Sequence, residues 1–224
     1  MDPEHTQRLN LNPLREVWRE RASRYGKRCV INLSIPEKLY DKTTLAQISS
    51  SFPILKAHLN GSERFVLDYG CGPGRFTPAL ADAIRKSQVI GYDPCAELLR
   101  YASYHPHVRY ASGPVQPFLS HRMRSGKLFD VIWITLVFGG LPEETVVGIA
   151  AALEETLAPN GLLFLAEHIS ETPAGSDFWK FRPKRFYCNA FKNVALEQAG
   201  VYTVLNDEIT TLVGRKRSIE SSPL

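Results

Sequence analysis

The sequence predicts a doubly wound α/β fold with a mostly parallel sheet. From residue 61 onward, short apolar runs alternate with helical patterns, which is typical of a parallel sheet covered by helices. The segment 129–136 is nearly all apolar, as expected of a strand covered on both faces. The first apolar run, Phe65–Leu67, leads through Asp68 into three glycines, Gly70, Gly72 and Gly74. We interpret this stretch as a strand, a tight turn and a helix N-terminus.

The first 60 residues predict a helical extension. Residues 14–28 place Leu14, Val17, Trp18, Ala22 and Tyr25 at helical spacing, with five arginines and one lysine between them. A second helix is predicted over 36–59, where the segment 49–53 can break it because Pro53 lies there. This extension either covers the core with a solvated basic face or acts as a lid over a ligand site.

Strands and helices then alternate along residues 61–217, and 218–224 form a polar tail. The predicted strands are 65–69, 88–92, 108–111, 129–136, 162–167, 201–205 and 209–215. The predicted helices are 74–86, 95–104, 115–123, 142–157 and 189–199, and a turn is predicted at 159–161. Gly200 is interpreted as the end of the last helix. The final two strands are expected to form an antiparallel hairpin.

Composition excludes several classes of protein. The apolar fraction of 44% and the charged fraction of 22% are ordinary for a globular domain, and the net charge of +4 is only mildly basic. The four cysteines contain no C-x-x-C pair, so we expect reduced thiols and no disulfide framework or metal site. No signal pattern and no apolar run of about 20 residues is present, so we expect a cytoplasmic protein without a membrane partner.

The spacing of the glycines restricts what the turn can bind. A phosphate-binding P-loop requires G-x-x-x-x-G-K-[ST], which is absent from the sequence. A dinucleotide site requires G-x-G-x-x-G, but here the spacing is G-x-G-x-G, and Arg75 stands where the last glycine would be. The spacing therefore opposes a nicotinamide oxidoreductase.

The turn with Asp68 resembles motif I of the class I S-adenosylmethionine-dependent methyltransferases. Asp93, at the end of the second predicted strand, matches the second motif of that family, and residues 129–135 and 142–165 match its fourth and fifth units. The resemblance implies a seven-stranded Rossmann-like sheet whose last strand is antiparallel. It also implies S-adenosylmethionine as the cofactor, bound by Asp68, Gly70, Cys71, Gly72, Gly74, Asp93, Pro94, Gly113, Val115 and Thr135.

These implied contacts have distinct roles. The methionyl carboxylate is expected near the glycine turn and the following helix N-terminus, and Asp93 is expected to accept hydrogen bonds from the ribose hydroxyls. The family often has an acid or serine after the glycine at the end of strand three. Here Pro114 follows Gly113, so the backbone of Val115 is left to contact the adenine.

Methyl transfer from a sulfonium requires alignment of a nucleophile, and a base only where the acceptor is protonated. Candidates for the base lie after strand five, where His168 is preferred over Glu167 and Tyr187. Each of these three residues also has a structural interpretation, as a strand-end or packing residue. The segment 176–187 alternates aromatic and basic side chains and either lines the acceptor pocket or is pinned to the domain by its aromatics. The residues expected to contact the acceptor are Trp18, Tyr25, Trp179, Arg182 and Arg185.

The sequence thus predicts a methyltransferase, either a monomer or a homodimer, that acts on an oxygen or nitrogen of a small molecule. A sugar-containing or carboxylated metabolite fits this prediction. One alternative is an RNA or protein methyltransferase that uses the basic segments to track phosphates. Another alternative is a noncatalytic partner that binds S-adenosylmethionine.

Overall fold

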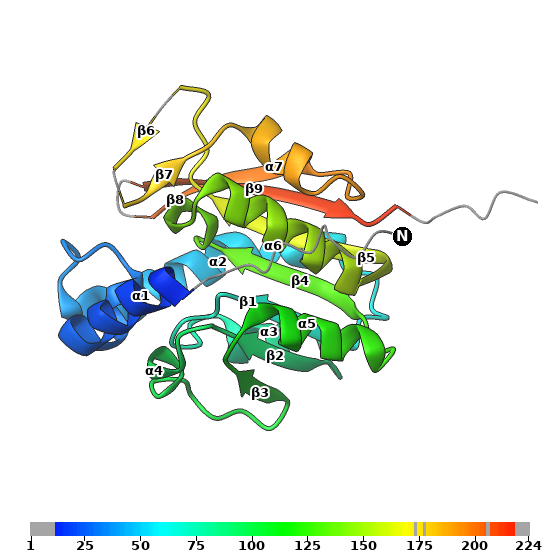
Figure 1. Cartoon of the computed structure of the whole chain (residues 1–224), viewed down its shortest axis with the longest axis horizontal. Helices are drawn as coiled ribbons and strands as arrows, with labels where there is room; N and C mark the ends of the chain where they lie inside the picture. The colour runs from blue at the N-terminus through cyan, green and yellow to red at the C-terminus, as the bar shows by residue number, and fades with distance from the viewer. Residues whose placement is uncertain (1–11, 173, 177, 205–206, 218–224) are drawn as a thin grey trace, which may run out of the picture.

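A computed structural model describes residues 12–172, 174–176, 178–204 and 207–217 (Figure 1). The predicted polar tail, 218–224, and most of the polar start of the chain lie outside the described residues. Among the described residues, no helix combines the length and the apolar character that crossing a membrane requires. The cytoplasmic location stays a prediction.

Seven strands form one sheet in the order β3-β2-β1-β4-β5-β9-β8. Strands β1 to β5 pair in parallel, whereas β9 runs antiparallel to both of its neighbours, β5 and β8. The predicted mostly parallel sheet with an antiparallel last strand is therefore confirmed. The strands are β1 Phe65–Tyr69, β2 Gln88–Tyr92, β3 Val108–Ala111, β4 Phe129–Thr135, β5 Leu157–Glu167, β8 Glu197–Val204 and β9 Asp207–Arg215.

Helices cover both faces of this sheet (Figure 1). One face packs against α5, α6 and α7, and the other against α2 and α3. On the second face, the Trp133 ring stacks on Phe164 at 4.1 Å, and Phe52 of α2 meets Trp133 edge-on. The helices are α1 Asn12–Tyr25, α2 Tyr40–His58, α3 Thr77–Ala83, α4 Ala96–Leu99, α5 Val115–Arg124, α6 Glu143–Thr156 and α7 Lys184–Ala190. Short 3₁₀ turns are η2 Gly26–Val30, η3 Glu37–Leu39 and η4 Phe138–Gly140, and β6 Ala174–Gly175 pairs with β7 Lys180–Phe181 in a small hairpin.

The second helix runs through Pro53 without the break that its sequence suggested. Its neighbours Phe52 and Leu55 are buried against the sheet, so tertiary packing holds the helix across the proline. Helices α3 and α4 are shorter than predicted. The bond from the Gly74 N–H to the Cys71 carbonyl keeps the start of the predicted helix 74–86 in a turn.

The predicted helix 189–199 is wrong. Helix α7 begins earlier, directly after Pro183, and residues 197–204 form strand β8, which pairs with β9. Gly200 lies in that strand, beside a register shift, where a Cβ would come within 2.6 Å of Ile54 Cδ1. The glycine is therefore explained by close packing against α2, not by a helix end, and pairing with β9 overrides the local helical pattern.

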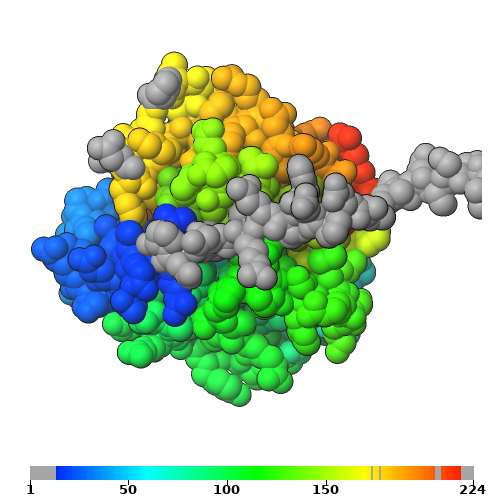
Figure 2. Space-filling view, viewed as in Figure 1, coloured from blue at the N-terminus to red at the C-terminus, as the bar shows by residue number. Residues whose placement is uncertain are grey.

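Helix α1 and the 3₁₀ turn η2 lie outside the layered sheet, next to α4 (Figure 1). Ala22, Cys29, Cys95 and Leu98 form a small core between these elements. Figure 2 shows the blue surface of α1 meeting the yellow segment around β6 and β7, where Trp18 contacts Phe178 edge-on with ring centroids 5.6 Å apart. The chain thus returns to α1 after the fifth strand, although the two segments lie far apart in the sequence.

Candidate active site

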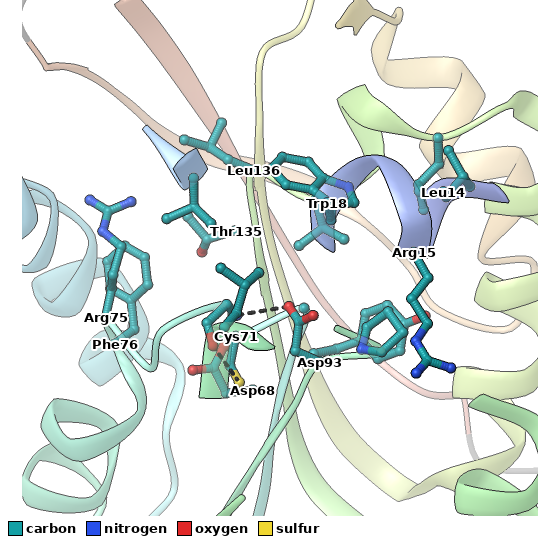
Figure 3. Close-up of a pocket in the computed structure, with 18 of the residues that line it drawn as sticks. Leu14, Arg15, Trp18, Asp68, Cys71, Arg75, Phe76, Asp93, Thr135 and Leu136 are labelled. Carbon is teal, nitrogen blue, oxygen red and sulfur yellow. Dashed lines mark hydrogen bonds between the residues drawn. The ribbon is translucent and has the colours of Figure 1, made fainter. Parts of the chain in front are cut away.

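A central cavity lies at the carboxyl ends of β1, β2 and β4, beneath α1 (Figure 3). Its volume is about 950 Å³ when the space open to solvent is included. Ligands of doubly wound sheets bind at this end of the strands. The cavity is lined by the turn after β1, by residues that follow β2 and β4, and by Leu14, Arg15 and Trp18 of α1.

Asp68 lies at the floor of the central cavity (Figure 3). Its carboxylate Oδ2 accepts a hydrogen bond from Thr77 Oγ1 at 2.6 Å, which ties the end of β1 to the start of α3. Burial raises the pKa of Asp68 to about 7, although the Thr77 bond acts in the opposite direction. This side chain therefore anchors the glycine turn and also faces the cavity.

The glycine turn requires backbone that other residues rarely adopt. Gly70, Gly72 and Gly74 have φ values of 70°, 55° and 74°, and a Cβ on Gly70 would come within 2.6 Å of the Val137 side chain. The N–H groups of Gly70 and Cys71 both donate to the carbonyl of Tyr92, at 2.8 and 3.0 Å. Because the Gly74 N–H also bonds within the turn, the N–H groups of Gly70, Cys71 and Gly74 are less available to a methionyl carboxylate than the sequence suggested.

Asp93 follows β2 and lies on the side of the central cavity where Arg15 projects from α1 (Figure 3). Its Oδ2 accepts the Gly72 N–H at 2.9 Å, and its Oδ1 accepts the Cys95 N–H at 2.8 Å. Burial raises the pKa of Asp93 to about 6 against the effect of these two bonds. The carboxylate thus joins the ends of β1 and β2 and keeps lone pairs toward the cavity.

Several further cavity residues were predicted. Pro94, Cys71 and Thr135 line the central cavity, and the buried Thr135 Oγ1 has no hydrogen-bond partner among the described residues. Trp18 and Trp179 lie there as well. An unpartnered hydroxyl aimed at a cavity is what a polar ligand would satisfy.

The Trp179 ring packs closely against two glycines that follow β4. A Cβ on Gly139 would come within 2.3 Å of Trp179 Cε2, and one on Gly140 within 3.2 Å of Trp179 Cζ3. The pair Gly139-Gly140 therefore provides the space that this indole ring occupies. The sequence shows both glycines after strand four, but nothing in it links them to a tryptophan 40 residues further on.

Three predicted site residues pack behind the central cavity and do not line it: Glu167, Tyr187 and Arg182. Glu167 Oε1 accepts the N–H groups of Val137 and Phe138, both at 2.7 Å. Tyr187 is fully buried, and burial raises its pKa well above the ordinary value. These placements give no support to the predicted catalytic roles of Glu167 and Tyr187.

Arg182, which was expected to contact the acceptor, instead holds the loop after β4. Its Nη1 donates to the Phe138 carbonyl at 2.7 Å, its Nη2 donates to the Leu141 carbonyl, and only 3% of its surface is exposed. Arg185 pairs with Glu171 at 2.9 Å on the exposed surface of the same segment.

Three other predicted contacts lie away from the central cavity. Tyr25 packs in the small core beneath α1, and Arg24 lies 5.2 Å from the centre of its ring. The Gly113 carbonyl accepts the Tyr92 hydroxyl at 2.7 Å, and Val115 is buried at the start of α5.

A second space, the lateral chamber, opens beside the central cavity toward β5, β8 and β9. The two spaces share wall residues: Trp18, Val30, Arg75, Leu136 and Trp179. Other walls of the lateral chamber come from α1, α2, the β6–β7 hairpin and the ends of the last strands, and include Arg21, Asn32, Gln47, His168, Phe181 and Ile209. Arg75 was noted in the sequence only for opposing a dinucleotide site, so its place between the two spaces was missed.

His168 lies in the lateral chamber, next to the turn in the chain that follows β5. Its ring stacks on Phe181 with centroids 4.7 Å apart, and its Nδ1 lies 2.8 Å from the carbonyl of Glu208. Since a carbonyl only accepts, Nδ1 carries a proton, and in the neutral form of the ring the lone pair is on Nε2. A neutral imidazole in this state is able to accept a proton.

The buried carboxyl of Glu167 predicts a pH-dependent stability. Burial raises its pKa to about 7 in the folded chain, above the value of about 4.3 in an unfolded chain. The folded state binds this proton more tightly, so the contribution to stability is complete below about pH 4.3 and is lost as the pH rises through 7. The Glu167→Gln variant is the reference, because its side chain does not titrate. We expect the stability of wild type relative to this variant, measured as the difference in free energy of unfolding, to fall by on the order of 2 kcal/mol between about pH 5 and pH 8. Urea unfolding at both pH values measures this, and a constant difference would contradict it.

Comparisons with known proteins agree with this geometry. Residues 66–161 match the family model described as a methyltransferase domain. The trans-aconitate 2-methyltransferase of Deinococcus radiodurans is 30% identical over 129 residues, which is 57% of this chain. The match spans 45% of that protein, so the chain covers less than half of the length of this curated relative.

Solved structures show the same fold. The magnesium protoporphyrin IX methyltransferase of Synechocystis PCC 6803 with bound S-adenosylhomocysteine has a TM-score of 0.69 at 15% identity, covering 93% of this chain and all of that one. An S-adenosylmethionine-dependent methyltransferase of Anabaena variabilis gives 0.69 at 15% identity, over 91% of this chain and 95% of that one. Human N-acetylserotonin methyltransferase has a TM-score of 0.57 at 12% identity, covering 91% of this chain and 67% of that one.

Sheet order, the glycine turn with its two acids and the matched family model agree with one another. The family model over residues 66–161 and the shared fold support a class I, Rossmann-like S-adenosylmethionine-dependent methyltransferase with S-adenosylmethionine as its cofactor.

Proposed function

We propose that this protein transfers a methyl group from S-adenosylmethionine to an oxygen or nitrogen atom of a small molecule held in the lateral chamber. The observation that carries the proposal is the shared wall of the two spaces, where Trp18, Leu136 and Trp179 border both the central cavity and the lateral chamber. A donor in one space and an acceptor in the other would meet at this wall. Alignment of the two reactants is the main contribution that a protein makes to such a displacement.

The central cavity fits the cofactor in two respects. Asp93 offers a carboxylate for the ribose hydroxyls, and Thr135 offers a hydroxyl that is unpartnered among the described residues. Bound S-adenosylmethionine supplies a sulfonium-activated methyl group. The protein positions that group, and the apolar wall residues exclude water from the path to the acceptor. We further propose the division into an N-terminal cap up to residue 60 and a cofactor domain, 61–217, with Trp18 of the cap closing the cavity.

A small acceptor is supported by the relatives. Their names give trans-aconitate, magnesium protoporphyrin IX and N-acetylserotonin as what they act on. The lateral chamber lies between the N-terminal cap and the β6–β7 hairpin, and its walls are mostly apolar and aromatic side chains. RNA and protein acceptors, and a noncatalytic role, are outcomes of the test below.

Incubation with methyl-labelled S-adenosylmethionine and separated cell metabolites, RNA and protein tests the proposal. We expect the label in the metabolites. Label only in RNA or protein would replace the small acceptor with a macromolecular one. Binding of S-adenosylhomocysteine without any labelled product would indicate a noncatalytic protein. Calorimetry with S-adenosylhomocysteine, run in parallel, shows that the preparation binds the cofactor product.

His168 is proposed as the base where the acceptor must lose a proton. Since its Nδ1 is bound to the Glu208 carbonyl, its Nε2 is the acceptor of that proton. We expect His168→Ala to lower the rate of transfer by roughly 100-fold or more without weakening the binding of S-adenosylhomocysteine. His58→Ala is the matched control, because His58 bonds a backbone carbonyl in the same way, at 2.8 Å from Ile54 O, on the exposed end of α2. A His168→Ala protein with full activity would exclude this role.

A further inference from the structure

We propose that the acceptor carries a carboxylate and that Arg75 holds it in the lateral chamber. The inference rests on the proposed function and names the chemical class of its substrate. It follows from the environment of Arg75 and from the charges that line this chamber.

Arg75 is a cation at the boundary of the two spaces. Its Nε donates to Thr44 Oγ1 at 3.0 Å, and its Nη2 donates to Gln47 Oε1. Both partners are neutral, and among the described residues no carboxylate lies within ion-pair distance of the guanidinium. A largely buried charge is costly unless an opposite charge pairs with it.

The geometry leaves a binding fork open on Arg75. A guanidinium has five N–H donors in a fixed plane, and the two bonds above engage two of them. The other three donate no hydrogen bond to the described residues. Two parallel N–H groups match the two oxygens of a carboxylate, which is the arrangement that guanidinium groups favour. The rings of Tyr40 and Phe76, with centres 5.8 and 5.2 Å from the guanidinium carbon, keep the side chain in place.

The rest of the lateral chamber favours an anion as well. Its described wall residues include Arg21, Arg75 and His168 but no aspartate or glutamate. Arg21 donates to the Cys29 carbonyl at 3.1 Å, and its Nε has no partner among the described residues. A cavity lined by one sign of charge with low-dielectric walls concentrates ligands of the opposite sign.

The anion belongs to the acceptor because Arg75 lies on the acceptor side of the site. Figure 3 shows Arg75 and Asp93 on opposite sides of the central cavity. The walls of the lateral chamber include His168, Val204 and Ile209, at the half of the sheet formed by β5, β9 and β8, whereas Asp93 follows β2 in the other half.

The chamber walls indicate what accompanies the carboxylate. Trp18, Phe178, Trp179 and Phe181 contribute four aromatic side chains to it. Aromatic walls of this kind bind flat apolar groups by stacking or edge contacts. We therefore expect a carboxylate attached to a flat or unsaturated body.

Separation of the metabolites by charge tests this class. Cell metabolites are passed over an anion exchanger at neutral pH, and the retained and unretained fractions are incubated with the labelled donor. We expect label in the retained fraction, unchanged by prior phosphatase treatment. Label only in unretained small molecules would overturn the carboxylate and leave the proposed function intact. Label that phosphatase abolishes would assign a phosphate instead, and label in RNA or protein alone would remove both proposals.

Variants of Arg75 test the residue. With the retained fraction as substrate, we expect Arg75→Gln to raise the KM by roughly 10- to 100-fold, because a hydrogen-bonded charge pair is lost. Arg75→Lys should restore the preference for retained over unretained substrates only in part, since an ammonium lacks the fork. Arg85→Gln, at an exposed arginine in the loop after α3, is the control and should match wild type.

Calorimetry with S-adenosylhomocysteine distinguishes the two carboxylates that Arg75 could hold. We expect Arg75→Gln to bind it within about threefold of wild type, which also shows that the variant is folded. A large loss of S-adenosylhomocysteine affinity with an unchanged acceptor KM would assign the guanidinium to the methionyl carboxylate and overturn the proposal. An unchanged KM and unchanged charge preference would overturn it as well.

Discussion

Asp93→Ala is expected to bind S-adenosylhomocysteine at least about 100-fold more weakly than wild type. The carboxylate is proposed to accept two ribose hydroxyls, and a hydrogen bond to a charged group contributes about 1.5 to 3 kcal/mol. Two such bonds amount to about 3 kcal/mol or more, which corresponds to a factor of more than 100 in Kd. The side chain also accepts the Gly72 N–H, so its removal loosens the glycine turn that lines the central cavity. Calorimetry with S-adenosylhomocysteine gives the two Kd values.

Asp82→Ala is the matched control for this experiment. Asp82 lies on α3 and its side chain is 77% exposed; among the described residues its only ion pair is with His105, at 3.2 Å. The control should therefore bind S-adenosylhomocysteine as wild type does. Circular dichroism of both variants reports whether they are folded. A folded Asp93→Ala protein with the wild-type Kd would contradict the assignment of Asp93 to the ribose.

Arg182→Ala should destabilise the fold strongly, whereas Arg185→Ala should not. Arg182 is buried. Its loss removes one of the two donors to the Phe138 carbonyl, the donor to the Leu141 carbonyl and a positive charge near Glu167. Breaking a buried charged network costs about 3 to 5 kcal/mol. Arg185 pairs with Glu171 on the surface, where an ion pair contributes about 1 kcal/mol or less. For a chain of this length, the first change should lower the Tm by about 10 °C.

Thermal unfolding of the two variants measures the difference. The comparison also separates a structural role from acceptor binding, because both arginines were predicted to contact the acceptor. An Arg182→Ala protein with the wild-type Tm and a raised acceptor KM would restore that prediction.

The strands of the cofactor half were predictable because local signals define them. The runs 65–69, 88–92 and 108–111 are apolar, short and bounded by turn residues, and the structure has β1, β2 and β3 at these bounds. The failure at 189–199 has a different cause. The end of that segment, 197–199, belongs to β8, which pairs with β9, and neither the pairing nor the contact of Gly200 with Ile54 is visible in local periodicity.

The site shows the same division. Asp68 and Asp93 line the cavity as their places at strand ends indicated. Glu167 and His168 also follow a strand, but neighbouring residues of an extended chain point to opposite sides. Glu167 therefore turns inward to the loop after β4, and His168 faces the lateral chamber. The sequence alone does not tell which of two adjacent side chains faces a ligand.

The position of α1 has a consequence for the rate of turnover. Leu14, Arg15 and Trp18 of α1 cover the central cavity, and Trp18 also contacts Phe178 of the segment that follows β5. We therefore expect product S-adenosylhomocysteine to leave, and fresh donor to enter, by a movement of this helix away from the sheet. We expect the steady-state rate to report this exchange more than the displacement itself, so that a pre-steady-state burst of methylated product precedes a slower phase.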